Sequence, residues 1–239
     1  MKTMVRENVL EVRGRMARAA QRAATDPSEI ALVAVTKNVA AEKMCQAIDA
    51  GITHIGESRI QEALPKYEQV RAYACAKGIA LSWHMIGHLQ TNKVREAVRL
   101  FDLIHSVDSV RLARRIDKEA AAIGKVQDVL VEVKTSPEAA KYGFMPDDVA
   151  GALKEMASLD HLSIKGLMTV APAAHDPREA RPYFRTLKEL LIRINELRVT
   201  HDELRVLSMG MTDDFEVAVE EGATAVRIGR GIFGDRKEA

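Results

Sequence analysis

The sequence of 239 residues has little cysteine, almost no net charge and no long apolar run. Cys45 and Cys75 are its only cysteines, which excludes a disulfide framework and a cysteine-rich metal site and indicates a reducing compartment. Thirty-five Lys and Arg balance 34 Asp and Glu, so no long-range field favours nucleic acid. No stretch approaches the ~18 apolar residues of a membrane span. We therefore expect a cytoplasmic protein without nucleic-acid or membrane partners.

Regular alternation of strand-like and helix-like segments is the main pattern that is present. The first 22 residues have apolar residues at helical spacing and predict an amphipathic helix. Short apolar segments then predict eight strands, over residues 31–36, 53–56, 82–87, 103–107, 126–133, 163–170, 204–207 and 224–228. The segments between and after them predict helices over residues 42–50, 57–77, 94–101, 110–123, 147–158, 176–197 and 214–221, with a last turn after residue 231.

Eight strands with interleaved helices predict an α/β protein with a closed parallel sheet, the (β/α)8 TIM barrel. We find no linker, so residues 1–239 are expected to form a single domain behind the N-terminal helix. Two local features add detail. The run Asp26-Pro27-Ser28-Glu29 predicts a capped turn, and Pro65 predicts that the helix over 57–77 either kinks or begins later.

In a TIM barrel the loops after the carboxyl ends of the strands form the functional site. The loops after the last two strands contain glycines, together with Ser208, Thr212 and Arg230. Loops of this kind, next to a helix N-terminus, often bind phosphate, because glycine allows backbone N–H groups to approach the anion. The alternative is that Gly210 and Gly229 only permit tight turns.

Lys37 follows the first, fully apolar strand, so its stem is expected to lie in a partly dry environment at the barrel mouth. Such a lysine suits a Schiff base, although a solvated surface lysine is the alternative. A lysine opposite a phosphate site is the combination that pyridoxal phosphate requires. His84, His88 and His105 lack the spacing of metal ligands and are expected to be hydrogen-bonded.

Several motifs together resemble the family of pyridoxal phosphate homeostasis proteins, whose fold is similar to the N-terminal barrel of alanine racemase. The resemblance spans nearly the whole chain and rests on the segments 34–37 (AVTK), 83–93 (WHMIGHLQTNK), 166–168 (GLM), 207–214 (LSMGMTDD), 226–229 (VRIG) and 232–234 (IFG). The chain departs from the family pattern at Ser58 and Arg59, where the family has asparagine and an aromatic residue, and at Thr212, where it has serine.

The resemblance implies that Lys37 holds pyridoxal 5'-phosphate as an internal aldimine and that Ser208, Gly229 and Arg230 surround the phosphate. It also implies that Arg227 faces the pyridine nitrogen. An arginine does not give up its proton, so the ring would remain unprotonated and a poor electron sink. We include His84 among the expected cofactor-binding residues.

Three functions are compatible with this pattern. The first is a monomeric, non-enzymatic protein of intracellular cofactor homeostasis, with pyridoxal phosphate and cofactor-dependent client enzymes as partners. Related racemases add a C-terminal domain with a catalytic tyrosine, and we expect no catalysed reaction without it. The second is a weak amino-acid racemase or lyase with His84 or Lys37 as base. The third is a barrel for another phosphorylated metabolite, in which Lys37 is free.

Overall fold

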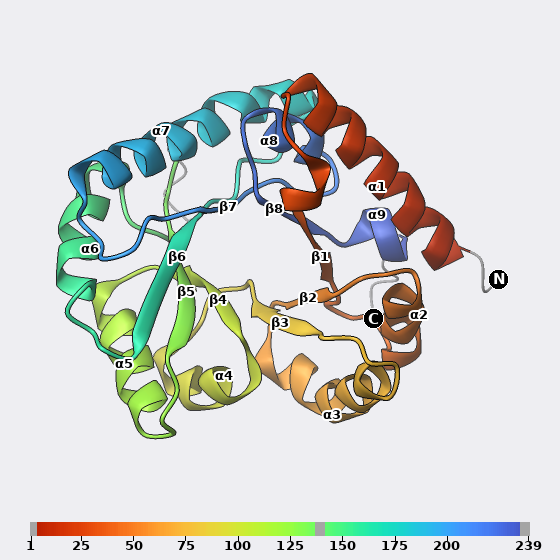
Figure 1. Ribbon diagram of the computed structural model, residues 1–239, viewed down its shortest axis with the longest axis horizontal. Coiled ribbons are helices and arrows are strands. Elements are labelled where there is room, and N and C mark those ends of the chain that lie inside the picture. Colours follow the sequence, from red (N-terminus) through yellow and green to blue (C-terminus); the bar gives the residue numbers. More distant parts are fainter. Residues whose placement is uncertain (1–3, 137–141, 235–239) are drawn as a thin grey trace.

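The computed structural model describes residues 4–136 and 142–234, and these form a closed eight-stranded barrel (Figure 1). All neighbouring strands are parallel, and β1 pairs with both β2 and β8, which closes the sheet. The strands are β1 (Ala31–Val35), β2 (His54–Glu57), β3 (Ser82–Met85), β4 (Leu103–Val107), β5 (Gln127–Glu132), β6 (Leu162–Met168), β7 (Val206–Ser208) and β8 (Ala225–Ile228). The predicted (β/α)8 fold is confirmed. The remaining residues of the predicted single domain, 1–3, 137–141 and 235–239, lie outside the described part.

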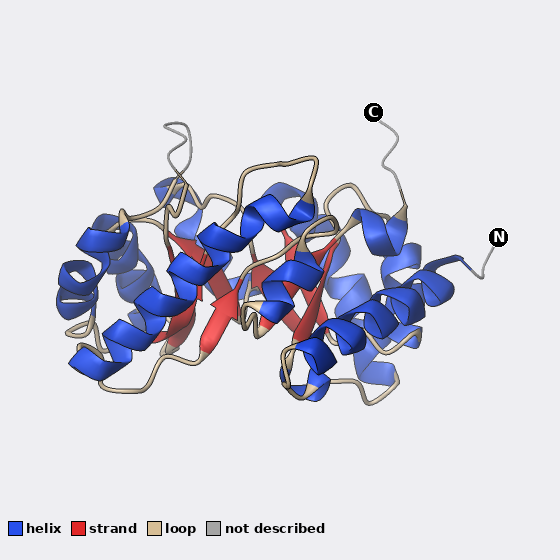
Figure 2. Ribbon diagram, turned by 90° about the horizontal axis from the view of Figure 1, so that it is seen from above, coloured by secondary structure: helices blue, strands red, loops and turns tan. Residues whose placement is uncertain are grey.

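Helices surround the barrel on its outside, as Figures 1 and 2 show. They are α1 (Met4–Arg22), α2 (Ala41–Asp49), α3 (Ile60–Ala76), α4 (Val94–Leu100), α5 (Val110–Ala121), α6 (Val149–Met156), α7 (Arg181–Leu197), α8 (Phe215–Glu220) and α9 (Arg230–Phe233). Each longer helix buries an apolar stripe, because its buried residues recur at spacings of three and four. None of the helices in the described part is both long and apolar enough to cross a membrane.

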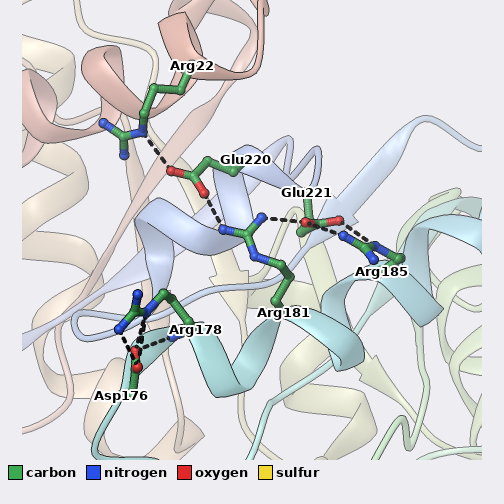
Figure 3. Close-up of polar contacts among 7 residues, drawn as sticks. All are labelled: Arg22, Asp176, Arg178, Arg181, Arg185, Glu220 and Glu221. Atoms are coloured by element: carbon green, nitrogen blue, oxygen red, sulfur yellow. Dashed lines mark hydrogen bonds and ion pairs between the residues drawn. The ribbon is translucent and has the colours of Figure 1, made fainter.

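The N-terminal helix α1 lies along the outside of the barrel closure, against α2, α8 and α9. Its apolar stripe is buried there, Arg6 and Arg18 are exposed, and Arg15 forms an ion pair with Glu216 of α8. A network of ion pairs joins α1 to α7 and α8 (Figure 3). Arg22 and Arg181 both bind Glu220, at 2.7 and 2.5 Å, and Arg181 and Arg185 both bind Glu221, at 2.6 and 3.2 Å.

The predicted turn at Asp26 is confirmed, since its carboxylate accepts a hydrogen bond from the Ser28 N–H. Several predicted boundaries are wrong, and two of the predicted helices begin clearly later than expected. The helix predicted over 57–77 begins only at Ile60, because Glu57 continues β2, and Pro65 lies inside this helix. The helix predicted over 176–197 starts as a separate 3₁₀ turn, Pro177–Ala180, before α7.

Candidate functional site

Alternation along the strands decides which side chains enter the barrel. A Cβ atom built on Gly56 would approach Val33 Cγ1 to 2.9 Å, so Val33 and the Gly56 position face the same interior. Two-residue periodicity then directs Val35 inward, and Thr36, whose hydroxyl binds Glu57, outward toward the helices. Lys37 follows two residues after the end of β1 and therefore lies at the carboxyl-end mouth of the barrel.

The Lys37 ammonium has no hydrogen-bond or ion-pair partner within residues 4–136 and 142–234. The backbone on either side of it is nevertheless firmly held. The Thr36 N–H donates to Gly56 O at 2.9 Å, and the Asn38 N–H donates to Glu62 Oε2 at 3.1 Å. Asn38 also adopts the left-handed conformation, with φ of 57°, which turns the chain away from the strand. The backbone around Lys37 is therefore held in place, while the amine of its side chain remains unpaired.

A buried ion pair supports this segment from the helix side. Glu57 is fully buried, and its Oε1 accepts hydrogen bonds from Lys66 Nζ and from Thr36 Oγ1, both at 2.6 Å. Lys66 also donates to Thr36 O at 3.0 Å and Val39 O at 3.3 Å, so all three of its donors are used. Because these carbonyls flank Lys37, the pair holds in place the segment that carries the free amine.

The loops after β7 and β8 meet next to the end of β1, because β8 pairs with both β7 and β1. Gly210 has a φ of 92°, and a Cβ atom there would approach Ala218 Cβ to 2.5 Å, so only glycine fits this turn. The Thr212 hydroxyl accepts from the Gly231 N–H at 3.3 Å. The N–H groups of Gly229 and Arg230, where α9 begins, have no hydrogen-bond acceptor in the described part of the chain.

Arg227, on β8, is 4% exposed and lies inside the barrel. Its Nη1 donates to Ser208 Oγ at 2.5 Å and its Nη2 to Thr169 O at 2.8 Å. Among the described residues, no carboxylate lies within ion-pair distance of it. Burial lowers the pKa of Arg227 to about 10, against the opposing influence of the Asp214 and Glu132 charges. The group is therefore still a cation at neutral pH, with further N–H donors to offer.

Three histidines continue inward from Ser208. His105 Nδ1 lies 2.9 Å from Ser208 Oγ, and His105 Nε2 lies 2.8 Å from His84 Nδ1. His84 Nε2 in turn lies 3.1 Å from His54 Nδ1 and 3.0 Å from Ser82 Oγ. Burial, reinforced by neighbouring positive groups, lowers the pKa of His84 to about 3 and that of His105 well below its usual range. These imidazoles are neutral at physiological pH.

Glu132 ends β5 at the same mouth, in register with Met168, which is itself in register with Ser208. Burial raises the pKa of its carboxyl to about 7, with a further contribution from the Asp108 charge and opposition from Arg227. The carboxyl therefore changes protonation near neutral pH.

The structure brings the expected site residues together only in part. Ser208 and Arg227 are in direct contact, and His84 is joined to them through His105. Arg230, with its side chain 53% exposed, forms an ion pair with Asp213. The Ser208 hydroxyl, expected near phosphate, is occupied by Arg227 and His105.

Sequence reasoning missed His54, Glu57, Lys66 and Glu132, and it did not connect His105 with the site. A signal for some of these was available. His54, His105 and Glu132 are polar residues at inward positions of their strands, which two-residue periodicity could have singled out. No three His, Cys, Asp or Glu side chains in the described ranges are grouped to hold a metal ion.

Comparison with known proteins gives a consistent result. The sequence model of the family described as the alanine racemase N-terminal domain matches residues 11–237 of this chain. A pyridoxal phosphate homeostasis protein of Aquifex aeolicus is 40% identical over 231 residues, which cover 97% of this chain and 98% of that protein. The structure of PipY of Synechococcus elongatus with pyridoxal phosphate bound has a TM-score of 0.83 and 34% identity, covering 96% and 100% of the two chains. An alanine racemase of Clostridium difficile, 14% identical, has a TM-score of 0.73 and shares the fold over 98% of this chain and 57% of its own.

Proposed function

Because this chain belongs to the family of pyridoxal phosphate homeostasis proteins, which have the fold of the alanine racemase N-terminal domain, we propose that it binds pyridoxal 5'-phosphate and serves its homeostasis. The observation that carries the proposal is the unpaired Lys37 amine just after β1, next to the strand that bears Arg227. Val33 on β1 is in register with Arg227, and Lys37 lies four residues further along the chain, beyond the end of the strand.

The groups at the mouth fit this cofactor chemically. A free primary amine suits its aldehyde, and free backbone N–H groups at Gly229 and Arg230 suit its phosphate. The unused donors of Arg227 suit a ring nitrogen that has kept its lone pair. Amine, cation and anion-binding loops thus come from three places on one barrel mouth.

When bound, the cofactor supplies an aldehyde that condenses with a primary amine. Lys37 would be this amine, held in place by the Glu57 and Lys66 pair behind it. Gly229, Thr212 and Arg230 would bind the phosphate, and Arg227 would donate to the ring nitrogen. Ser208 would help to hold Arg227 in position, because its hydroxyl oxygen accepts a hydrogen bond from that guanidinium.

We propose further that the protein holds the cofactor without catalysing a reaction of its own. His84 supports this proposal, because both of its ring nitrogens are hydrogen-bonded and burial lowers its pKa to about 3, so it is a poor base. A guanidinium at the ring nitrogen also favours an unprotonated ring, which withdraws electrons weakly.

One observation favours a second function, a weak racemase or lyase. The Glu132 carboxyl has a pKa of about 7 and lies on the inward side of β5 at the mouth, where it could accept a proton near neutral pH. Exchange of the α-proton of amino acids in heavy water separates the two functions. Exchange that Glu132→Gln abolishes would establish the enzyme, and no exchange with a broad panel of amino acids would support the carrier.

The binding proposal is tested by the visible spectrum of the purified protein after addition of pyridoxal phosphate. We expect a yellow band that borohydride removes, with the reduced cofactor found by mass spectrometry on the peptide that contains Lys37. A Lys37→Ala variant should lose the band and a Lys43→Ala variant, altered at an exposed helical lysine, should keep it. A colourless wild-type protein would contradict the proposal.

The proposal includes a monomer in a reducing, cytoplasmic environment that passes cofactor to client enzymes. Cys45 and Cys75 are both free thiols, which suits such an environment. Light scattering of the purified protein tests the monomer. Transfer is tested by activation of an apoenzyme, which should be faster from the loaded protein than from an equal concentration of free cofactor.

A further inference from the structure

A continuous hydrogen-bonded chain crosses the barrel interior from the mouth to the opposite end. It begins at Arg227 and passes through Ser208, His105 and His84 to His54. His54 and His84 line a cavity of about 550 Å³ among the first residues of the strands, at the end of the barrel opposite Lys37. Ser208, His84 and His105 are buried, so this chain lies in the core rather than on the surface.

The direction of every hydrogen bond in the chain follows from its first member. Arg227 only donates, so the Ser208 oxygen is an acceptor toward it. If His105 Nδ1 also donated to this oxygen, the buried Ser208 proton would have no acceptor in the described part of the chain. The Ser208 hydroxyl therefore donates to His105 Nδ1, and the His105 proton resides on Nε2.

The same reasoning extends to the next two rings. His105 Nε2–H donates to His84 Nδ1, so the His84 proton also resides on Nε2, where it faces His54 Nδ1 and Ser82 Oγ. His54 then accepts at Nδ1 and carries its proton on Nε2. Three neutral imidazoles with a common tautomer result, each with its electron-rich nitrogen toward Arg227.

This alignment matters because Arg227 is a buried cation whose hydrogen-bond partners are all neutral. Oriented dipoles stabilise a buried charge without neutralising it. A carboxylate in the place of Ser208 would take donors and charge away from a ligand. The neutral chain orients the guanidinium and leaves both its charge and its other N–H groups available.

We propose that His54, His84, His105 and Ser208 form a positioning chain that sets the orientation of Arg227 through a single directed series of hydrogen bonds. Its role toward pyridoxal phosphate rests on the function proposed above. The tautomers themselves do not depend on it, because they follow from the protein alone.

The tautomers can be measured by long-range ¹H–¹⁵N correlation on the full-length protein without added cofactor at pH 7.5. We expect three imidazoles with the proton on Nε2, assigned by comparison with His54→Gln, His84→Gln and His105→Asn. An Nδ1–H tautomer or a charged ring at His84 or His105 would overturn the proposal, whether or not the protein binds pyridoxal phosphate.

The positioning role is tested by two substitutions of one residue. His105→Asn places a carbonyl oxygen near the position of Nδ1 and keeps the acceptor for Ser208, whereas His105→Leu removes it. We expect the dissociation constant for pyridoxal phosphate to rise about tenfold in His105→Leu, with a shifted absorption maximum, and to remain within about threefold of wild type in His105→Asn. His175→Leu, on an exposed loop, is the control.

The Arg227 side chain provides a readout without cofactor. In the wild type its Nη protons should give separate, slowly exchanging signals, and these should merge in His105→Leu and persist in His105→Asn. Equal behaviour of the two variants would overturn the positioning role. If wild type binds no pyridoxal phosphate but shows the expected tautomers and Nη signals, the proposed function fails and the hydrogen-bonded chain stands.

Discussion

Lys66, with its side chain 14% exposed, lies outside the barrel wall, and Arg227, 4% exposed, lies inside it, and the two cations are stabilised in different ways. Lys66 lies behind β1 and β2, binds the buried carboxylate of Glu57 at 2.6 Å and uses every donor on protein acceptors. Arg227 lies inside the barrel and binds a hydroxyl and a carbonyl. A cation paired with a carboxylate serves the fold, whereas one held by neutral groups keeps charge and donors for a ligand.

The two cations also differ in whether the polar atoms around them have hydrogen-bond partners. The second oxygen of Glu57, Oε2, is buried without a hydrogen-bond partner in the described structure. The carboxylate therefore depends on Lys66 and Thr36 alone. Around Arg227 the acceptors form an extended chain that shares the interaction among several residues. Removal of one partner should accordingly cost more at Lys66 than along the chain.

The largest expected effect comes from Lys66→Met, which leaves the Glu57 charge buried and unpaired. We expect the free energy of unfolding to fall by about 3–5 kcal/mol, measured by urea denaturation. Arg114→Met, which breaks the exposed pair with Glu155, is the matched control and should change it by no more than about 0.5 kcal/mol. Equal losses in the two variants would remove the distinction between the two cations.

Lowering the pH should reduce the free energy of unfolding, because the buried histidines next to Arg227 are neutral in the folded state. In the unfolded chain His84 has its usual pKa of 6.5, whereas burial lowers it to about 3 in the folded state. Between these pH values the unfolded chain binds more protons than the folded chain. The contribution of the neutral His84 ring to stability is therefore full above pH 6.5 and is lost as the pH decreases. From pH 8 to pH 5 the loss should be about 2 kcal/mol for this imidazole. His84→Gln should lose about that much less than wild type, and an identical pH dependence would contradict the burial of a neutral ring.

Glu132 should show the opposite pH dependence. Its folded pKa of about 7 exceeds the usual 4.5, so the folded state binds the extra proton and stability falls as the pH rises from about 4.5 to 7. Glu132→Gln should therefore raise the free energy of unfolding by about 3 kcal/mol at pH 8 and leave it nearly unchanged at pH 4. Stabilisation that is equal at both pH values would show that the carboxyl does not titrate in this range.

The smallest effect is expected where cations are partly exposed. Arg181 links α7 to Glu220 and Glu221 on the α8 side (Figure 3), with its side chain 33% exposed. Arg181→Met should lower the free energy of unfolding by about 1 kcal/mol, and 1 M NaCl should reduce the difference from wild type. A loss as large as that in Lys66→Met would mean that exposure does not separate these cations.

The part of the site that could be predicted is the part carried by local patterns. Lys37 was located by the apolar strand before it, and Gly210 and Gly229 by the loops after β7 and β8. The histidine chain was not predicted, because His54, His84, His105 and Ser208 come from β2, β3, β4 and β7. Their contacts depend on the register and closure of the barrel, and neither can be predicted from the spacing of residues along the chain. Glu57 was missed because a boundary error placed it in a helix.

The sequence by itself determined the eight strands, the helices between them and the family, since apolar periodicity, caps and motifs are local properties. Only the tertiary structure decided how the charges are held. A buried cation takes its partners from whichever strands the closed barrel brings beside it, and these partners set its free donors and its pKa. Lys66 and Arg227 are both cations in the sequence, and the fold alone makes one a support for Lys37 and leaves the other with donors to offer.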